Sequence, residues 1–363
     1  RSNPEEQGGA SVCGAPLFFC DFVLADVSMF AGNDLKERTI DLNTESKLFL
    51  PLSPDELERV MRAVFPDERV QASRLLDGGL FNTTYRVETT AHDVVLRMGP
   101  MHPELLLPFE ENLMAAEAYV DDLCRANGVP ASSVLCCDTS HSVIDRDFMV
   151  VERIDSIPMS DPMIPEAALQ ALSVSCGALV RRLHEIEGEK FGRISEILRG
   201  RGQDTWGSAV LMEYQNLIAA SQKYGVFEDE LLKWALAFAE GAVSLLDRVK
   251  TPRLAHADLW YGNILVKAQS DHTYAVRAII DGDRAVFGDV SFDLDSPWMI
   301  NDAFLEGYGE ISSAFSPEED RRKKQVYSLL FALTDAYVWR VEYCSENNYQ
   351  SCLAQAKSIL QDK

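Results

Sequence analysis

Hydrophobic positions near residue 55 follow a helical spacing that has clear boundaries. Ser53-Pro54-Asp55-Glu56 has the features of a helix start: a capping serine, then proline, then a glutamate three positions after the serine. The apolar residues that follow recur on one helical face, and they are Leu57, Val60, Met61, Val64 and Phe65. Pro66 stops the pattern, so a helix is predicted between Ser53 and Pro66.

Between residues 67 and 154 the pattern changes to short strands around one helix. The predicted strands are Val70–Leu76, Phe81–Glu88, Asp93–Met98, Val134–Cys137 and Phe148–Ile154. A helix is predicted from Phe109 to Ala126, where Asn127-Gly128 ends it. This order of elements predicts a small lobe with a five-stranded sheet.

After residue 154 the spacing becomes mainly helical. The predicted helices are 165–187, 207–223, 227–248, 317–342 and 347–361, with short strands at Ile264–Lys267 and Ala275–Ile280. A sheet-rich lobe followed by a larger helical lobe is an α+β arrangement. We expect an N-terminal extension of unclear structure over residues 1–48, an N-lobe over 49–154 and a C-lobe over 155–363.

Composition places the chain among ordinary globular proteins. It has 363 residues, 47% of them hydrophobic and 25% charged, and this length suits two lobes. The eight cysteines form no C-x-x-C pair, which is typical of reduced thiols and predicts a cytoplasmic protein. No apolar run is long enough for a membrane span.

Charge narrows the range of partners. The net charge of −23 opposes binding to nucleic acid and to anionic membranes, and it favours a cationic partner or substrate. Solubility alone is an equally good reason for such acidity. The oligomeric state is not indicated by the sequence.

The candidate catalytic residues lie mainly in one segment, which begins at His256. His256-Ala257-Asp258-Leu259-Trp260-Tyr261-Gly262-Asn263 reads H-x-D-x-x-x-x-N and runs directly into a predicted strand; Asp281 ends the next strand. Phosphoryl transfer needs hard oxygen ligands for magnesium, and Asn263 and Asp281 supply them. It also needs a carboxylate, Asp258, that accepts the proton of the attacking hydroxyl. His256 is expected to brace the loop.

The chain resembles the aminoglycoside phosphotransferase family, protein-kinase-like small-molecule kinases that include relatives of choline kinase. His256–Val266 is similar to the catalytic loop of that family, and Ile280–Leu294 is similar to its metal-binding loop and the acidic segment after it. The resemblance extends from about Leu52 to the C-terminus. It implies a protein-kinase-like two-lobe fold, ATP and Mg²⁺ as cofactors, and a small-molecule hydroxyl as the acceptor.

The same resemblance implies a nucleotide site in the N-lobe. Leu76–Val87 resembles the loop that covers the nucleotide, with Gly78, Gly79, Phe81, Asn82 and Thr83 as its candidate residues. Arg97 stands where such kinases place a phosphate-binding lysine. Glu117 is its candidate partner, with Glu110 and Glu111 as alternatives. Glu152 and Ile154 take the place of the hinge that contacts adenine.

The acceptor side is acidic. Eight acidic residues and one basic residue lie between Asp281 and Glu310. Asp283, Asp302 and Glu306 are candidate acceptor contacts, whereas Asp289 and Asp293 are expected to have structural roles. Trp260-Tyr261 replaces the smaller residues often found in this loop.

Three functions remain open at this point. The acceptor could be a cationic antibiotic of the aminoglycoside or hygromycin type, or a metabolite such as choline, homoserine or a sugar. A kinase-shaped binding module without turnover is the third, although such modules usually lack the base or a metal ligand. Asp258, Asn263 and Asp281 are all present, which favours an enzyme.

Overall fold

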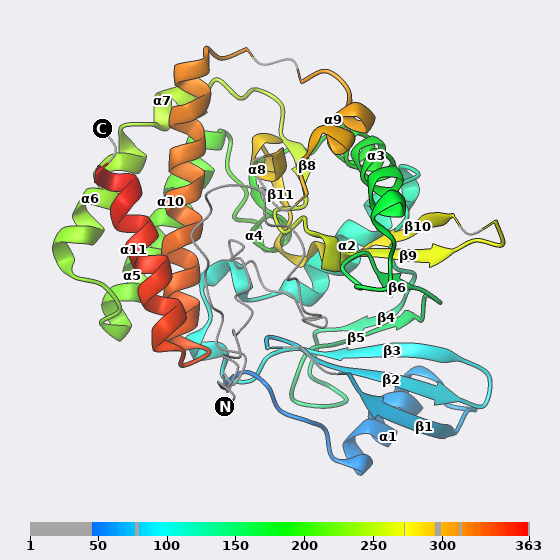
Figure 1. The fold of residues 1–363 in the computed structure, drawn as a ribbon. Coiled ribbons are helices and arrows are strands. Elements are labelled where there is room, and N and C mark those ends of the chain that lie inside the picture. The colour runs from blue at the N-terminus through cyan, green and yellow to red at the C-terminus, as the bar shows by residue number, and fades with distance from the viewer. Residues whose placement is uncertain (1–45, 77–79, 272, 295–298, 312–313, 362–363) are drawn as a thin grey trace, which may run out of the picture.

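The computed structural model describes residues 46–76, 80–271, 273–294, 299–311 and 314–361. Figure 1 shows two lobes, a small one built on a sheet and a larger one made mainly of helices. The expected α+β, protein-kinase-like two-lobe fold is therefore confirmed.

The small lobe is built on one antiparallel sheet with the strand order β1-β2-β3-β5-β4. Its strands are β1 (Val70–Leu75), β2 (Thr83–Thr89), β3 (Asp93–Met98), β4 (Val134–Asp138) and β5 (Phe148–Glu152). Helix α1 (Pro54–Val64) covers one face of the sheet, because Val60 and Met61 share a core with Val87 and Leu96. The helix starts with the predicted capping box, formed by Ser53 and Glu56.

Helix α2 (Leu113–Ala126) lies between the sheet and the large lobe (Figure 1). Met114 packs in a small core with residues of β5, whereas Val120 belongs to a core of the large lobe. The prediction that this helix begins at Phe109 was wrong. Pro108–Glu110 forms a separate 3₁₀ turn, and Asn112 has a φ of 120°, which no α-helix contains.

The large lobe has two groups of helices (Figure 1) and two small three-stranded sheets among its described residues. One group contains α5 (Trp206–Tyr224), α6 (Asp229–Glu240), α7 (Val243–Leu246), α10 (Pro317–Val341) and α11 (Glu346–Gln361). The other contains α3 (Glu166–Leu183) and α9 (Asp302–Tyr308), which pack together. Among the described residues, no helix combines the length and the apolar character that a membrane crossing requires.

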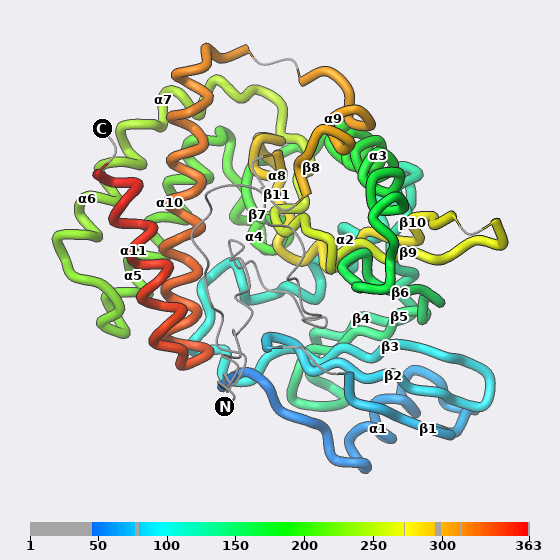
Figure 2. Tube along the Cα trace, viewed as in Figure 1, coloured from blue at the N-terminus to red at the C-terminus, as the bar shows by residue number. Residues whose placement is uncertain are grey.

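Short elements fill the centre of this lobe. The strands are β6 (Ile157–Pro158), β7 (Gly192–Arg193), β8 (Arg253–Ala255), β9 (Ile264–Ala268), β10 (Tyr274–Ile279) and β11 (Val286–Gly288). The helical turns are η1 (Pro103–Leu105), η2 (Pro108–Glu110), α4 (Ile194–Leu198), η3 (Tyr261–Asn263), η4 (Gly282–Arg284) and α8 (Ser291–Leu294). Figure 2 shows β7, β11 and β8 side by side, in agreement with their sheet order.

Several elements of this lobe differ from the prediction. The helix predicted over 227–248 is two helices, because the chain breaks at Gly241-Ala242 between α6 and α7. The pattern did not predict α4, α8 or α9, or the strands β6, β7, β8 and β11. These elements are short, and tertiary contacts rather than a repeating pattern stabilise them.

Residues 46–52 cross from the large lobe to the small one. The Lys47 backbone N–H donates to the Glu342 carbonyl at the end of α10, at 3.0 Å, and Leu48 is fully buried in a core of the large lobe. The Arg146 guanidinium then donates to the Leu50 carbonyl in the small lobe, at 2.7 Å. The end of the predicted extension thus connects the lobes, while residues 1–45 lie outside the described residues.

Candidate active site

The loop between β8 and β9 carries Asp258 and Asn263. Both side chains are buried. The Asn263 amide nitrogen donates to the Asp258 carbonyl at 3.0 Å and to its carboxylate at 3.1 Å. This orients the amide so that its nitrogen faces Asp258, and the orientation of the two predicted site residues is therefore coupled.

Asp281 lies beside this loop, directly after β10. The Ile280 backbone N–H donates to the Asn263 carbonyl at 2.9 Å, and His256 Nε2 lies 2.9 Å from the Ile280 carbonyl. Burial lowers the pKa of His256, so its ring is neutral and Nε2–H donates this bond. The expected bracing position of His256 is thus explained by a hydrogen bond between the two loops.

Two residues of the site have left-handed backbone conformations. Ala257 has a φ of 62° and Asp281 a φ of 65°. Such conformations cost an L-residue about 1 kcal/mol or more and persist where the surroundings impose them. No sequence signal predicted them, because neither residue is a glycine.

Arg97 connects the small lobe to this site. Its guanidinium forms an ion pair with Glu117 of α2 and a second one with Asp281, at 2.7 Å. The alternatives for the Glu117 position have other partners, because Glu110 pairs with Arg284 and Glu111 with Arg199. The structure therefore brings Arg97, Glu117 and Asp281 together from three distant segments.

The site has an excess of buried negative charge. Burial raises the pKa of the Asp258 carboxyl well above its usual value, the charge of Asp281 adds to this, and Arg284 opposes it. Burial also raises the pKa of Glu117 strongly, although Arg97 acts in the opposite direction. One carboxylate oxygen each from Glu117, Asp281 and Asp283 lie within 4.8 Å of one another. Such a site favours the binding of a cation.

Asp293 fixes the start of the catalytic loop. Its carboxylate accepts the backbone N–H groups of His256, at 2.7 Å, and Ala257, at 2.6 Å. It also lies 2.9 Å from His184 Nε2, and His184 Nδ1 lies 2.8 Å from the Tyr308 hydroxyl. This buried chain joins the catalytic loop to α3 and α9, in line with the structural role expected for Asp293.

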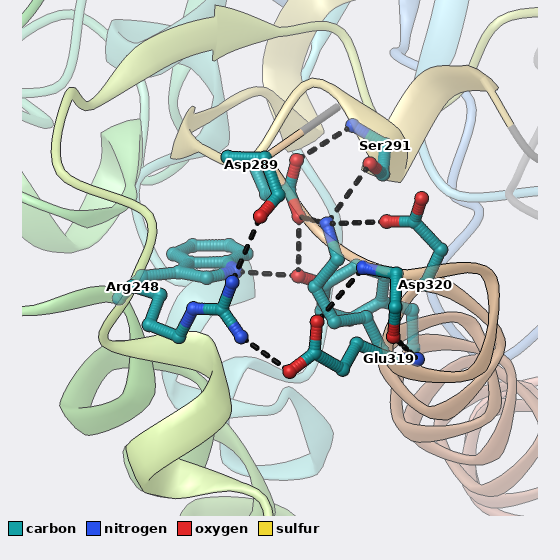
Figure 3. A network of polar contacts seen from close by, with 10 residues as sticks. Arg248, Asp289, Ser291, Glu319 and Asp320 are labelled. Atoms are coloured by element: carbon teal, nitrogen blue, oxygen red, sulfur yellow. Dashed lines mark hydrogen bonds and ion pairs between the residues drawn. The ribbon is translucent and has the colours of Figure 1, made fainter. Parts of the chain in front are cut away.

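Asp289 fixes the next segment. Lys323 Nζ of α10 donates to the Asp289 carboxylate at 2.7 Å, and the Tyr327 hydroxyl donates to it at 2.9 Å. Figure 3 shows this network, in which Ser291 and Asp320 surround the contact and Arg248 pairs with Glu319 beside it. The chain that follows the site is thereby anchored on α10.

Only three of the five residues predicted for the nucleotide-covering loop lie among the described residues. Gly78 and Gly79 lie outside the described residues. Phe81 and Asn82 are buried, and Thr83 is the first residue of β2 with its hydroxyl 3.2 Å from the Leu50 carbonyl. The Thr83 side chain therefore faces the connecting segment, and β2 begins two residues after Phe81, the predicted start of this strand.

The predicted hinge and acceptor residues occupy different environments. Glu152 ends β5 at the junction of the lobes, and Ile154 follows it. Asp283 is buried in η4, close to Asp258. Asp302 and Glu306 are exposed and lie one turn apart on α9.

Comparison with known proteins gives the family. Residues 73–324 match the Phosphotransferase enzyme family. The chain belongs to this family. Among curated proteins, no match was found.

Solved structures with this fold include a thermostable mutant of the aminoglycoside phosphotransferase APH(4)-Ia in its apo form. It is 16% identical with a TM-score of 0.61, and 84% of this chain and 98% of that chain are covered. A putative fructosamine-3-kinase from Haemophilus somnus 129PT is 16% identical, with a TM-score of 0.58 and coverage of 84% and 95%. Another from Thermobifida fusca YX-ER1 is 20% identical, with a TM-score of 0.55 and coverage of 83% and 98%.

Identities this low show a shared fold and leave the substrate open. Family membership makes the protein a small-molecule kinase, a phosphotransferase with an alcohol group as acceptor. The sequence reasoning missed the Arg97–Asp281 ion pair and the Asp293–His184–Tyr308 chain. The only sequence signal for the Asp293–His184–Tyr308 chain was the position of His184 on an apolar helix face. A histidine in such a position is more often a core residue.

Proposed function

We propose that this phosphotransferase transfers the γ-phosphate of ATP to a hydroxyl of a small molecule, with Asp258 as the base. The observation that carries the proposal is that Asp258 and Asn263 are buried and hydrogen-bonded to each other, and that buried Asp281 follows Ile280, whose backbone N–H donates to the Asn263 carbonyl. A bond forms between the acceptor oxygen and the γ-phosphorus as the bond from that phosphorus to ADP breaks. The hydroxyl proton passes to the Asp258 carboxylate.

Mg²⁺ is the cofactor that best fits this chemistry. Asn263 and Asp281 would hold it, because they place an amide and a carboxylate at adjoining loop ends. When bound, Mg²⁺ offsets the negative charge of the phosphates. The cluster of Glu117, Asp281 and Asp283 supports a cation here, because one carboxylate oxygen from each lies within 4.8 Å of the others.

We assign nucleotide binding to the residues that join the two lobes at Arg97, Glu117 and Asp281. Arg97 would bind phosphate oxygens with its planar fork, and Glu117 would hold that fork in place. Glu152 and Ile154 would offer backbone groups to adenine. A mutant of APH(4)-Ia with the same fold, 15% identical with a TM-score of 0.57, forms a ternary complex with ADP and hygromycin B, which supports ATP as the donor.

Replacing Asp281 by asparagine is expected to weaken Mg²⁺-dependent nucleotide binding on the order of 100-fold, because a charged metal ligand becomes neutral. Isothermal titration with AMP-PNP, with and without Mg²⁺, measures this. Asp271→Asn on the exposed β9–β10 turn is the matched control and should change nothing. Unchanged Mg²⁺-dependent affinity in the Asp281 variant would remove this residue from the metal site.

A cationic acceptor, such as an aminoglycoside, is the favoured substrate class. Asp283 is buried near Asp258, and Asp302 and Glu306 are exposed on α9, so acidic groups border the proposed acceptor side. The alternative is a metabolite kinase. It is supported by the putative fructosamine-3-kinases, whose solved structures share this fold. A catalytically silent binding module is a weaker alternative, because all three central residues are present.

A panel of acceptors read by ADP release tests the substrate class. The panel contains aminoglycosides, choline, homoserine and neutral sugars. We expect turnover with a polycationic acceptor, and an increase of about 3- to 10-fold in its KM in the double variant Asp302→Asn/Glu306→Gln, with kcat retained. Turnover with neutral sugars alone would contradict the cationic class, and no ATP consumption with or without acceptors would favour the silent module.

A further inference from the structure

Tyr261 lies inside the catalytic loop, between the proposed base Asp258 and the proposed metal ligand Asn263. It is the first residue of η3, and Asn263 is the last. Its hydroxyl lies 3.1 Å from the Asn301 amide nitrogen and 3.4 Å from the Ser173 hydroxyl. One side chain of the loop thus reaches both α3 and the start of α9.

The direction of these hydrogen bonds is fixed by the helix cap. Asn301 is the N-cap of α9, and its side-chain oxygen accepts the Phe304 backbone N–H at 2.9 Å. The amide nitrogen of Asn301 therefore faces Tyr261 and donates to its hydroxyl. The Tyr261 hydroxyl can then donate its own proton toward Ser173 of α3.

The neighbours of Tyr261 leave the loop little freedom to compensate. The Trp260 indole lies over Gly262, where an added Cβ would come within 2.1 Å of the ring. On the other side of η3, the Asn263 amide is bonded to Asp258. A shift of Tyr261 would therefore be transmitted to both predicted functional residues.

We propose that Tyr261 is a positioning residue, whose hydroxyl ties the Asp258–Asn263 loop to α3 and to the start of α9. The roles of Asp258 as the base and Asn263 as a metal ligand in this inference rest on the proposed function. The helix α9 carries Asp302 and Glu306, so the same contact links the acceptor side to the metal side. Tyr261 acts through Asn263 and takes no part in bond making.

The test compares four variants that keep the fold. Tyr261→Phe removes only the hydroxyl. Asn301→Ser keeps an N-cap for α9 but removes the donor to Tyr261. The double variant shows whether the two changes remove the same contact. Tyr119→Phe, at an exposed position on α2, is the matched control.

The first measurement is the Mg²⁺ concentration that gives half-maximal binding of AMP-PNP. We expect it to rise about 3- to 10-fold in Tyr261→Phe and in Asn301→Ser, and no further in the double variant. Nucleotide binding without Mg²⁺ should stay the same in all variants, which a general loss of stability would not allow. An additive effect in the double variant would contradict the proposed link.

The second measurement does not depend on the proposed function. Hydrogen exchange of the amides in residues 257–264 is expected to become faster in Tyr261→Phe and Asn301→Ser, and to stay unchanged in Tyr119→Phe. Unchanged exchange in both single variants would overturn the positioning role. If AMP-PNP binding to the wild type does not depend on Mg²⁺, while exchange is faster in Tyr261→Phe and Asn301→Ser, the metal site is refuted. The role of Tyr261 in positioning the loop is then retained.

Discussion

Asp258→Asn is expected to lower kcat about 100- to 10,000-fold while the dissociation constant for Mg·ATP changes little. Asparagine matches the size of aspartate, and its side-chain oxygen can still accept the Asn263 amide bond, 3.1 Å long in the wild type. It cannot accept the proton of the attacking hydroxyl at neutral pH. The change adds no negative charge near Asp281, so nucleotide phosphates meet no added repulsion.

Steady-state kinetics with the acceptor found in the panel measure this effect, and calorimetry with Mg·AMP-PNP gives the affinity. The thermal midpoint of the variant serves as the control for folding. A kcat within about threefold of wild type would mean that Asp258 is not the base, because a general base contributes far more than that. An equal loss of kcat and nucleotide affinity would indicate a distorted site.

Asp293→Ala is expected to lower the free energy of unfolding by about 3–5 kcal/mol, because it removes the buried acceptor of three hydrogen bonds and each buried group left unpaired costs about 1–3 kcal/mol. The wild-type carboxylate accepts two backbone N–H groups and contacts His184, and alanine leaves all three without that partner. Activity should fall as well, because the backbone of His256 and Ala257 is no longer held in place.

Denaturant unfolding of wild type, Asp293→Ala and Asp293→Asn measures the effect. Asparagine keeps one acceptor oxygen, so its loss should be intermediate. Asp302→Ala on the exposed end of α9 is the control, with an expected change of less than about 0.5 kcal/mol. A loss below about 1 kcal/mol in Asp293→Ala would show that the loop is held by other contacts.

The grouping of the candidate site residues could be predicted because the sequence patterns that indicate it are short. Asp258 and Asn263 are five positions apart, and Asp281 ends the next strand, so short-range spacing was enough to associate them. The capping box at Ser53 predicted a helix start for the same reason. Fold class followed from the change of period near residue 154.

Long-range partners could not be predicted in the same way. Glu110, Glu111 and Glu117 were all candidates for Arg97, and the structure separates them because Glu117 lies on α2, whereas Glu110 ends η2 and Glu111 follows it. The predicted start of α2 was wrong because Asn112 adopts a positive φ, for which the sequence gives no signal. The break between α6 and α7 follows tertiary packing, since helical spacing continues through it.

By itself, the sequence predicted the two-lobe fold and most of the longer elements, and it grouped Asp258, Asn263 and Asp281 as candidate site residues, because local periodicity and spacing encode these features. Only the tertiary structure decided which distant side chains meet: Arg97 with Asp281 across 184 positions, and Asp293 with His184 across 109. The same is true of Tyr261, which as a sequence feature was only a bulky substitution. Such contacts depend on how distant segments pack, and burial rather than local pattern determines the strength of each pair.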